Sequence, residues 1–178
     1  AITISDESGE VLETGGGVLF AADYFKNQAA WLVMNADILT TLPLDKMIAA
    51  DNLLRDENEN YIGTLAVTNR TTSRNLLFNQ KGFLIGWKNN TTLEEKWADA
   101  KTNLNEDANN IVPKAFSGIQ IIHTSFFTAL QLQGKFSLID AYLQIAATNT
   151  IGYYDHSDSI LMDVGKPENL EKAATLFP

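Results

Sequence analysis

Two aspartates stand where a carboxylate could bind a metal ion. Asp37 follows the apolar run 31–34, and Asp163 follows the apolar run 160–162 and precedes a glycine turn. In open α/β sheets, ligands bind beyond the carboxyl ends of the strands. Magnesium takes one or two protein carboxylates and fills its other positions with phosphate oxygens and water. The pair could therefore share one Mg²⁺ ion, although an aspartate at a strand end can equally cap the next turn or helix.

A run of three glycines, Gly15 to Gly17, precedes an expected helix. Consecutive glycines let a ligand approach the backbone closely, because no side chain intervenes. The N–H groups of the first helical turn could then bind an anion or the polar edge of a base. The alternative is an ordinary tight turn.

Two arginines, Arg70 and Arg74, follow an expected strand. A guanidinium group suits a phosphate or a carboxylate, but a solvated loop explains the same residues. Neither His123 nor His156 has the spacing of a metal-binding motif, and a role in proton transfer would need positioned partners that the sequence does not show. There is no GxSxG, Walker or GxGxxG motif, so hydrolase, P-loop and Rossmann dehydrogenase functions lack support.

The spacing of apolar residues predicts the elements that must position these side chains. Strands alternate with helices, interrupted by one hairpin, which is typical of a single α/β domain with a mostly parallel mixed sheet flanked by helices. The expected strands are a short one within 1–13, then 31–34, 63–68, 76–78, 83–85, 116–122, 151–154 and 160–162. The expected helices are 18–25, 43–54, 125–132, 137–147 and 167–176, and the polar stretch 88–112 should be a long loop that could hold a helix around 93–100.

The composition excludes several classes of function. The 22 acidic residues outnumber the 13 basic ones and give a net charge of −9, which disfavours nucleic-acid binding. The absence of cysteine rules out disulfides, thiolate metal sites and a cysteine nucleophile. The apolar runs are too short to cross a bilayer and the first residues do not resemble a signal peptide, so a cytoplasmic protein is the default expectation.

Taken in order, six segments resemble the NDP-sugar pyrophosphorylase family, in particular bacterial mannose-1-phosphate guanylyltransferases and N-acetylmuramate-1-phosphate uridylyltransferases. Each segment is weak alone, but their order and spacing over nearly the whole chain make the set fairly specific. They are LETGGG at 12–17, WLVMNAD at 31–37, NRTTSR at 69–74, FSGI at 116–119, FSLID at 136–140 and MDVGKPE at 162–168.

The resemblance implies a Rossmann-like nucleotide-diphosphosugar transferase fold and an Mg²⁺-dependent enzyme that joins a nucleoside triphosphate to a sugar 1-phosphate and releases pyrophosphate. Asp37 and Asp163 match the two catalytic, magnesium-binding aspartates. The other matched residues fall in two groups: Thr14, Gly15, Gly16 and Asn35 with the nucleotide, and Gly118 and Arg70 with the sugar phosphate.

One departure from the family pattern concerns the triphosphate site. The family begins with a strand and a loop of the type GxGxRxxPxT, with a Pro-Lys pair later in the chain, and nothing like that loop occurs here. The resemblance therefore implies that residues 1–178 are a single domain whose N-terminal βα segment is missing, and that the isolated chain is inactive. An unpaired sheet edge would then invite association with another chain, including a second copy.

Two other functions stay open. The same fold could serve as a non-catalytic protein that binds nucleotide sugars or regulates a partner, since fold alone does not decide function. The glycines and aspartates could also be turn residues without any ligand. The nucleobase and the sugar cannot be read from the sequence.

Overall fold

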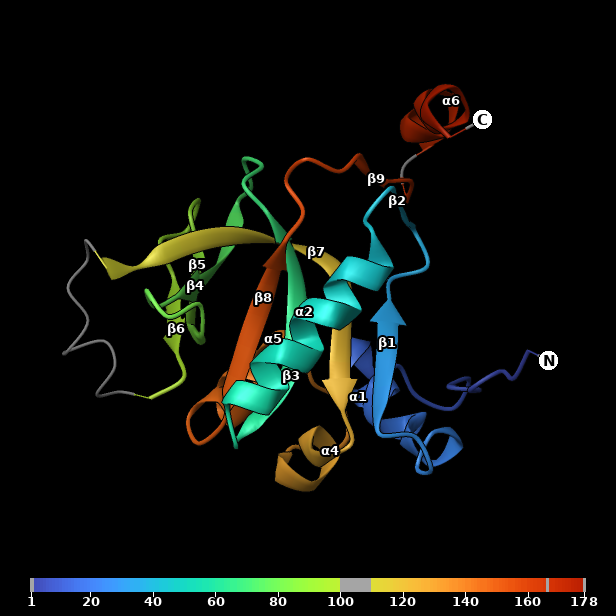
Figure 1. The fold of residues 1–178 in the computed structure, drawn as a ribbon. Helices are drawn as coiled ribbons and strands as arrows, with labels where there is room; N and C mark the ends of the chain where they lie inside the picture. The colour runs from blue at the N-terminus through green and yellow to red at the C-terminus, as the bar shows by residue number, and fades with distance from the viewer. Residues whose placement is uncertain (1, 100–109, 166, 178) are drawn as a thin grey trace.

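The fold is a central sheet with helices on both faces, seen in a computed structural model that describes residues 2–99, 110–165 and 167–177 (Figure 1). The main sheet has seven strands, and two further short strands form a ribbon at its upper end in Figure 1. The α/β class is confirmed. Helix α2 lies in front of the sheet in this view, and α5 lies behind it.

The strands of the main sheet run in the order β6-β5-β4-β7-β3-β8, with β1 also paired to β7. Their bounds are β1 Ala30–Met34, β3 Tyr61–Thr68, β4 Arg74–Phe78, β5 Leu84–Asn89, β6 Glu95–Trp97, β7 Val112–His123 and β8 Thr150–Asp155. The small ribbon pairs β2 Ile38–Thr40 with β9 Leu161–Asp163.

The expectation of a mostly parallel sheet is wrong for the described strands, in which β3 and β8 form the parallel pair and the other ladders are antiparallel. The reason is the placement of β7. Strands β1, β3 and β8 all run in one direction, as strand–helix–strand units require. However, β7 runs the opposite way and lies between β1 and β3, where it separates two strands that point alike.

Six described helices cover the sheet or its ends. They are α1 Glu13–Phe20, α2 Leu44–Glu57, α4 Ser125–Ala129, α5 Leu138–Ala146, α6 Pro167–Leu176 and the short 3₁₀ turn η1 Ala22–Tyr24. Ser137 caps the start of helix α5: its side chain accepts a hydrogen bond from the backbone N–H of Asp140 and so satisfies one free donor of the first turn. None of these helices combines the length and the apolar character needed to cross a bilayer.

Each face of the sheet has its own apolar core. Alternate residues of β3 show the division, since Leu65 and Val67 pack behind the sheet whereas Ala66 packs in front. The rear core includes Tyr142 of α5, and the front core includes Met47 of α2, and both side chains are fully buried. Apolar side chains are therefore buried on both faces of the sheet, and both cores stabilise it.

Several local expectations were wrong. Residues 2–12 form no strand, and the first helix begins at Glu13, ahead of the expected residue 18. Within 93–100 the described residues contain strand β6, not a helix, because Glu95 to Trp97 pair with β5. Strand β2 was not expected, and residues 100–109 of the expected loop lie outside the described residues.

Strand β1 differs from the buried strand that its apolar run predicts. It pairs with β7 on one side, and no strand among the described residues pairs with its other edge. Leu32 and Met34 are correspondingly exposed, whereas Trp31 is buried against Phe25 and Phe127.

Candidate functional site

The two aspartates singled out in the sequence lie side by side in the structure. A Cβ atom placed on Gly165 would lie 3.0 Å from Oδ2 of Asp37 and 3.1 Å from Oδ1 of Asp163. Both carboxylates therefore converge on the space that any other side chain at position 165 would occupy. Both aspartates are exposed, so a ligand from solvent can reach them.

The β2–β9 ribbon brings the aspartates together, although they are far apart in the chain. Ile38, next to Asp37, pairs with Asp163, and the backbone N–H of Val164 donates to the carbonyl of Asp37 at 2.7 Å. Oδ1 of Asp163 accepts a hydrogen bond from the N–H of Gly165 at 2.9 Å. The register of three residue pairs in this ribbon thus fixes the convergence.

The two carboxylates of Asp37 and Asp163 suit Mg²⁺ better than they suit a metal whose ligands all come from the protein. In the described part of the chain, no group of three or more His, Cys, Asp or Glu side chains could hold a metal. Two carboxylates with open space between them match the way Mg²⁺ uses one or two protein carboxylates and takes its remaining oxygens from phosphates and water. Asp37 and Asp163 are therefore the residues that would hold the ion.

A cavity of about 240 Å³ adjoins Asp163 at the carboxyl ends of β1 and β3. It brings together four of the residues selected from the sequence, and it adds others that were not selected. Its walls are formed by Asn35, Ile38, Arg70, Phe116, Ser117, Gly118, Leu161 and Asp163.

Gly118 is required at the wall of this cavity for two reasons. Its φ of 72° lies in the left-handed region, which costs other residues energy. A Cβ atom at this position would also lie 2.8 Å from Nδ2 of Asn35, so the Asn35 side chain would have to move. The backbone carbonyl of Gly118 accepts a hydrogen bond from the N–H of Asn35 at 2.9 Å, so these two residues face each other across the β1–β7 ladder.

Arg70 supplies positive charge to the cavity. One of its terminal nitrogens, Nη2, donates to the carbonyl of Phe116 at 2.9 Å, which uses one of the five N–H groups of the guanidinium. A second cavity, of about 250 Å³, is also lined by Arg70 and Phe116, together with Arg74 and Trp87. Arg70 therefore stands between two adjoining cavities, with donors available to an anion in either.

The glycine run has a different environment. Among the described residues that line the Asp163 cavity, Thr14, Gly15 and Gly16 do not occur. The N–H groups of Gly15 and Gly16 both donate to the carbonyl of Phe136, and a Cβ on Gly15 would lie 2.5 Å from the Phe136 ring. Close packing against Phe136 thus accounts for the glycine at position 15. This packing explains the residue without any ligand.

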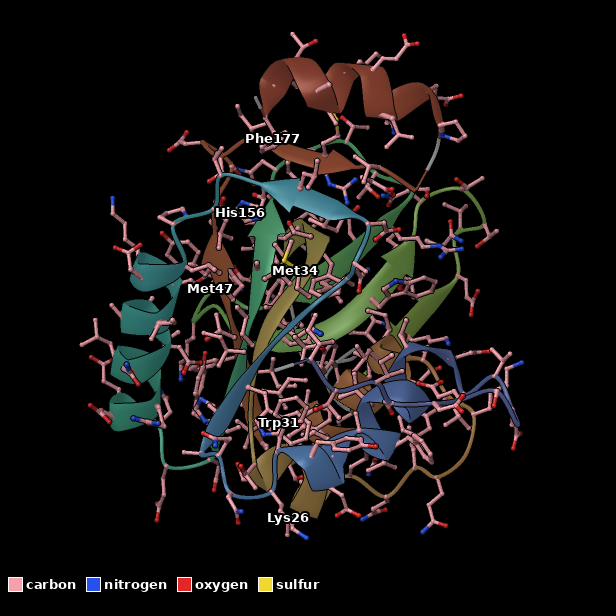
Figure 2. All side chains as sticks on the ribbon, turned by 90° about the vertical axis from the view of Figure 1, so that its right-hand side faces the viewer. Lys26, Trp31, Met34, Met47, His156 and Phe177 are labelled. Carbon is pink, nitrogen blue, oxygen red and sulfur yellow. The ribbon has the colours of Figure 1, made fainter. Side chains whose placement is uncertain are left out.

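Ser117 lines the cavity and His156 contacts Ser117, but neither was selected from the sequence. Nε2 of His156 lies 2.8 Å from Oγ of Ser117, and both residues are buried. Figure 2 places His156 at the upper end of the sheet, toward the β2–β9 ribbon and away from Trp31. The residues are 39 positions apart, so no local pattern signals the contact, although Ser117 lies in the FSGI segment.

His156 carries a perturbed imidazole. Burial, which penalises the charged form, is the main reason that its pKa lies below the ordinary 6.5. Nearby Asp155 opposes the shift, and nearby Arg70 adds to it. The imidazole is consequently neutral at pH 7.

The comparisons with known proteins bear on the fold. No protein-family model matches the sequence, and no curated protein matches it. Solved structures do match. HddC from Yersinia pseudotuberculosis complexed with GMP-PN has a TM-score of 0.63 and 17% identity, over 95% of this chain and 64% of that one. A UDP-glucose pyrophosphorylase with UDP-glucose has a TM-score of 0.64 and 15% identity, over 94% and 63% of the two chains, and the inositol-1-phosphate CTP transferase of T. maritima has a TM-score of 0.56 and 11% identity, over 93% and 61%.

The likeness covers almost all of this chain but less than two thirds of each of these structures. At these low identities the likeness establishes the three-dimensional arrangement and no particular substrate. The chain therefore has the Rossmann-like nucleotide-diphosphosugar transferase fold, as the sequence resemblance implied.

Proposed function

We propose that this protein acts in sugar-nucleotide synthesis, as a nucleotidyltransferase that joins a nucleoside triphosphate and a sugar 1-phosphate. The observation that carries the proposal is the convergence of Asp37 and Asp163 beside a cavity that contains Arg70. Two exposed carboxylates that converge in this way repel each other weakly, and a cation between them would replace that repulsion by attraction. A cation and an arginine side by side suit a ligand rich in phosphate.

The reaction needs no covalent nucleophile from the protein. An oxygen of the sugar phosphate attacks the α-phosphorus of the triphosphate, and the bond from that phosphorus to its bridging oxygen breaks. Pyrophosphate leaves with the bridging oxygen and the electron pair of the broken bond. Holding the two substrates in line and stabilising their charge supply most of the catalysis.

Each proposed role follows from the chemistry of the residue. Asp37 and Asp163 would hold Mg²⁺, which would supply stabilisation of the charge that develops on the phosphates. Arg70 binds the phosphate of the sugar 1-phosphate, and Gly118 lets the sugar come close to the backbone.

The remaining roles concern the nucleotide. Asn35, which is exposed at the end of β1 and lines the cavity, contacts the nucleotide. Thr14, Gly15 and Gly16 orient the base; Thr14 is exposed, and its hydroxyl accepts a hydrogen bond from the N–H of Leu138 at 3.1 Å. A net charge of −9 supports small phosphate ligands bound at a local positive site rather than a nucleic acid.

The metal role can be tested by titrating Mn²⁺ into the protein in the presence of UDP-glucose and other nucleotide sugars, followed by electron paramagnetic resonance. Asp163→Asn keeps the size and the Oδ1 acceptor of residue 163 but removes its charge, and it should weaken Mn²⁺ binding by about 10- to 100-fold or more. Asp158→Asn, an exposed carboxylate outside the cavity, is the matched control and should change little. Equal affinities in the two variants would contradict the proposal.

Turnover separates catalysis from the alternative of a non-catalytic protein that binds nucleotide sugars. The four nucleoside triphosphates are each combined with a panel of sugar 1-phosphates, and pyrophosphate release is measured. Tight binding of a nucleotide sugar without any pyrophosphate release would support the non-catalytic alternative.

A further inference from the structure

The wall of the Asp163 cavity contains an irregularity in β7. Leu65 of β3 pairs with Gln120, but Val67, two residues on, pairs with Phe116, so four residues of β7 span two of β3. The extra residues form a bulge around Gly118, whose φ is 72°. Three consecutive residues of the bulge, Phe116 to Gly118, line the cavity.

Each of these three residues is held by a different part of the chain. The carbonyl of Phe116 accepts from Arg70 of the β3–β4 loop, and the carbonyl of Gly118 accepts from the N–H of Asn35 after β1. Ser117 contacts Nε2 of His156 after β8, at 2.8 Å. Arg70 and Asn35 line the cavity themselves, whereas His156 lies behind the wall and contacts it through Ser117.

His156 is itself firmly placed. Its backbone N–H donates to the carbonyl of Val67 at 2.9 Å, and its carbonyl accepts from the N–H of Ser159 at 2.8 Å. Its side chain is buried, and Nδ1 finds no hydrogen-bond partner in the described part of the chain. Because orphaned buried N–H groups are rare, the proton belongs on Nε2, from which His156 donates to Ser117.

We propose that His156 is a positioning residue of the candidate site, which fixes the Phe116–Gly118 bulge through the hydroxyl of Ser117. The bulge in turn sets the position of Gly118 and of the Asn35 side chain against it. The identity of the ligand, a sugar phosphate, rests on the proposed function, but the hold of His156 on the bulge does not.

A pair of neutral amide substitutions tests this directly. His156→Gln places an amide N–H where Nε2 was, and His156→Asn is one methylene too short to reach Ser117. Both variants lose the ring, so a purely structural role predicts that they behave alike. We expect His156→Asn to weaken binding of glucose 1-phosphate or mannose 1-phosphate, measured by calorimetry with Mg²⁺, by about 10-fold, and His156→Gln to restore it to within about threefold.

Hydrogen exchange provides a readout that needs no ligand. The amide of Asn35 donates to Gly118 and reports on the bulge, whereas the amide of Thr124, which donates to Ala29, reports on the other end of the same pair of strands. His156→Asn should lower the protection of the Asn35 amide by about 10-fold without changing that of Thr124. His156→Gln should leave both amides as in the wild type.

A double variant checks that the two residues act as a unit. Ser117→Ala should resemble His156→Asn, and the combination should be no worse than either change alone. Additive effects, or equal Asn35 protection in the Gln and Asn variants, would overturn the role of His156. If the wild type binds neither sugar phosphate, the proposed function fails, and the exchange result still decides whether His156 holds the bulge.

Discussion

Asp51 and the pair of Asp37 and Asp163 have opposite environments in this protein. Asp51 of α2 is 3% exposed, and its oxygens meet Nε2 of His123 at 2.8 Å and the hydroxyl of Thr64 at 2.6 Å. Asp37 and Asp163 are exposed and face each other without a positive side chain between them among the described residues. Asp51 is enclosed and hydrogen-bonded, whereas Asp37 and Asp163 are open to solvent.

The comparison shows how the same side chain serves two purposes. The hydroxyl of Thr64 gives its hydrogen to Asp51, so the hydroxyl of Tyr61, 2.6 Å away, donates to Thr64 in turn. A buried chain of this kind holds the front of β3 against α2, and removing one member leaves others unpaired. In the open pair, Oδ1 of Asp163 accepts a hydrogen bond from the N–H of Gly165, and the role proposed for the pair is to bind a metal ion.

The largest expected effect comes from Asp51→Ala, which leaves His123 and Thr64 buried without their partner. We expect a loss of about 3–5 kcal/mol in the free energy of unfolding, measured by urea denaturation. Asp56→Ala, at an exposed position of the same helix, is the control and should stay within about 0.5 kcal/mol. Ligand affinity of the folded fraction should not change. A loss below that of an ordinary hydrogen bond would break the distinction between the two groups.

Gly118→Ala should have the next largest effect, because the open site depends on a strained backbone position. The left-handed φ and the clash with Asn35 together should cost about 1–3 kcal/mol, with weaker ligand binding as well. Gly9→Ala serves for comparison, since no atom lies within 4 Å of the added Cβ. Similar stability of the two variants, measured by urea denaturation, would mean that the bulge readily relaxes.

Tyr61→Phe probes the end of the buried chain. The ring is kept, and only the hydroxyl that donates to Thr64 is lost, which should cost about 1 kcal/mol in thermal or urea unfolding. Thr64 keeps its bond to Asp51, so the effect should be well below that of Asp51→Ala. An equal loss in the two variants would show that the chain acts as one indivisible unit.

His156 should make the stability of the protein depend on pH, with an effect intermediate in size between those of Asp51→Ala and Asp163→Asn. Because its folded pKa is below the unfolded value of 6.5, the unfolded state binds more protons, and stability should be complete above pH 6.5 and fall as the pH drops below it. His156→Gln should remove this part of the slope in urea unfolding between about pH 7 and pH 5. An unchanged slope would assign it to another group.

A neighbouring carboxylate does not interfere in this range. Partial burial alone would raise the pKa of Asp155, but hydrogen bonds from Lys114 and Ser157 bring it below the ordinary 3.8. Its contribution to stability is present above that value and is lost only as the pH falls through its lower folded pKa. The two contributions are therefore separated by pH.

Asp163→Asn should have the smallest effect on stability. Without metal, the melting temperature should stay the same or rise slightly, because a repulsion between like charges is removed. With Mg²⁺ and a nucleotide sugar, the wild type should gain melting temperature by ligand linkage and the variant should not. Destabilisation as large as that of Asp51→Ala would place Asp163 among the structural aspartates.

The local pattern of the sequence determined much of this protein. Apolar runs predicted the positions of β1, β3, β7 and β8, and proline at 167 predicted the start of α6. The same pattern marked Asp37 and Asp163 as strand-end carboxylates. These features are readable because side-chain periodicity and helix-start chemistry depend on residues only a few positions apart.

The tertiary structure alone decided which strands meet. The insertion of β7 between β1 and β3 turned an expected parallel sheet into a mainly antiparallel one, and the β2–β9 ribbon brought Asp37 to Asp163. The same holds for Ser117 and His156, and for Gly15 against Phe136. Such contacts join segments tens to more than a hundred residues apart, and their geometry follows from the packing of the whole chain, which a local pattern of apolar and polar residues does not encode.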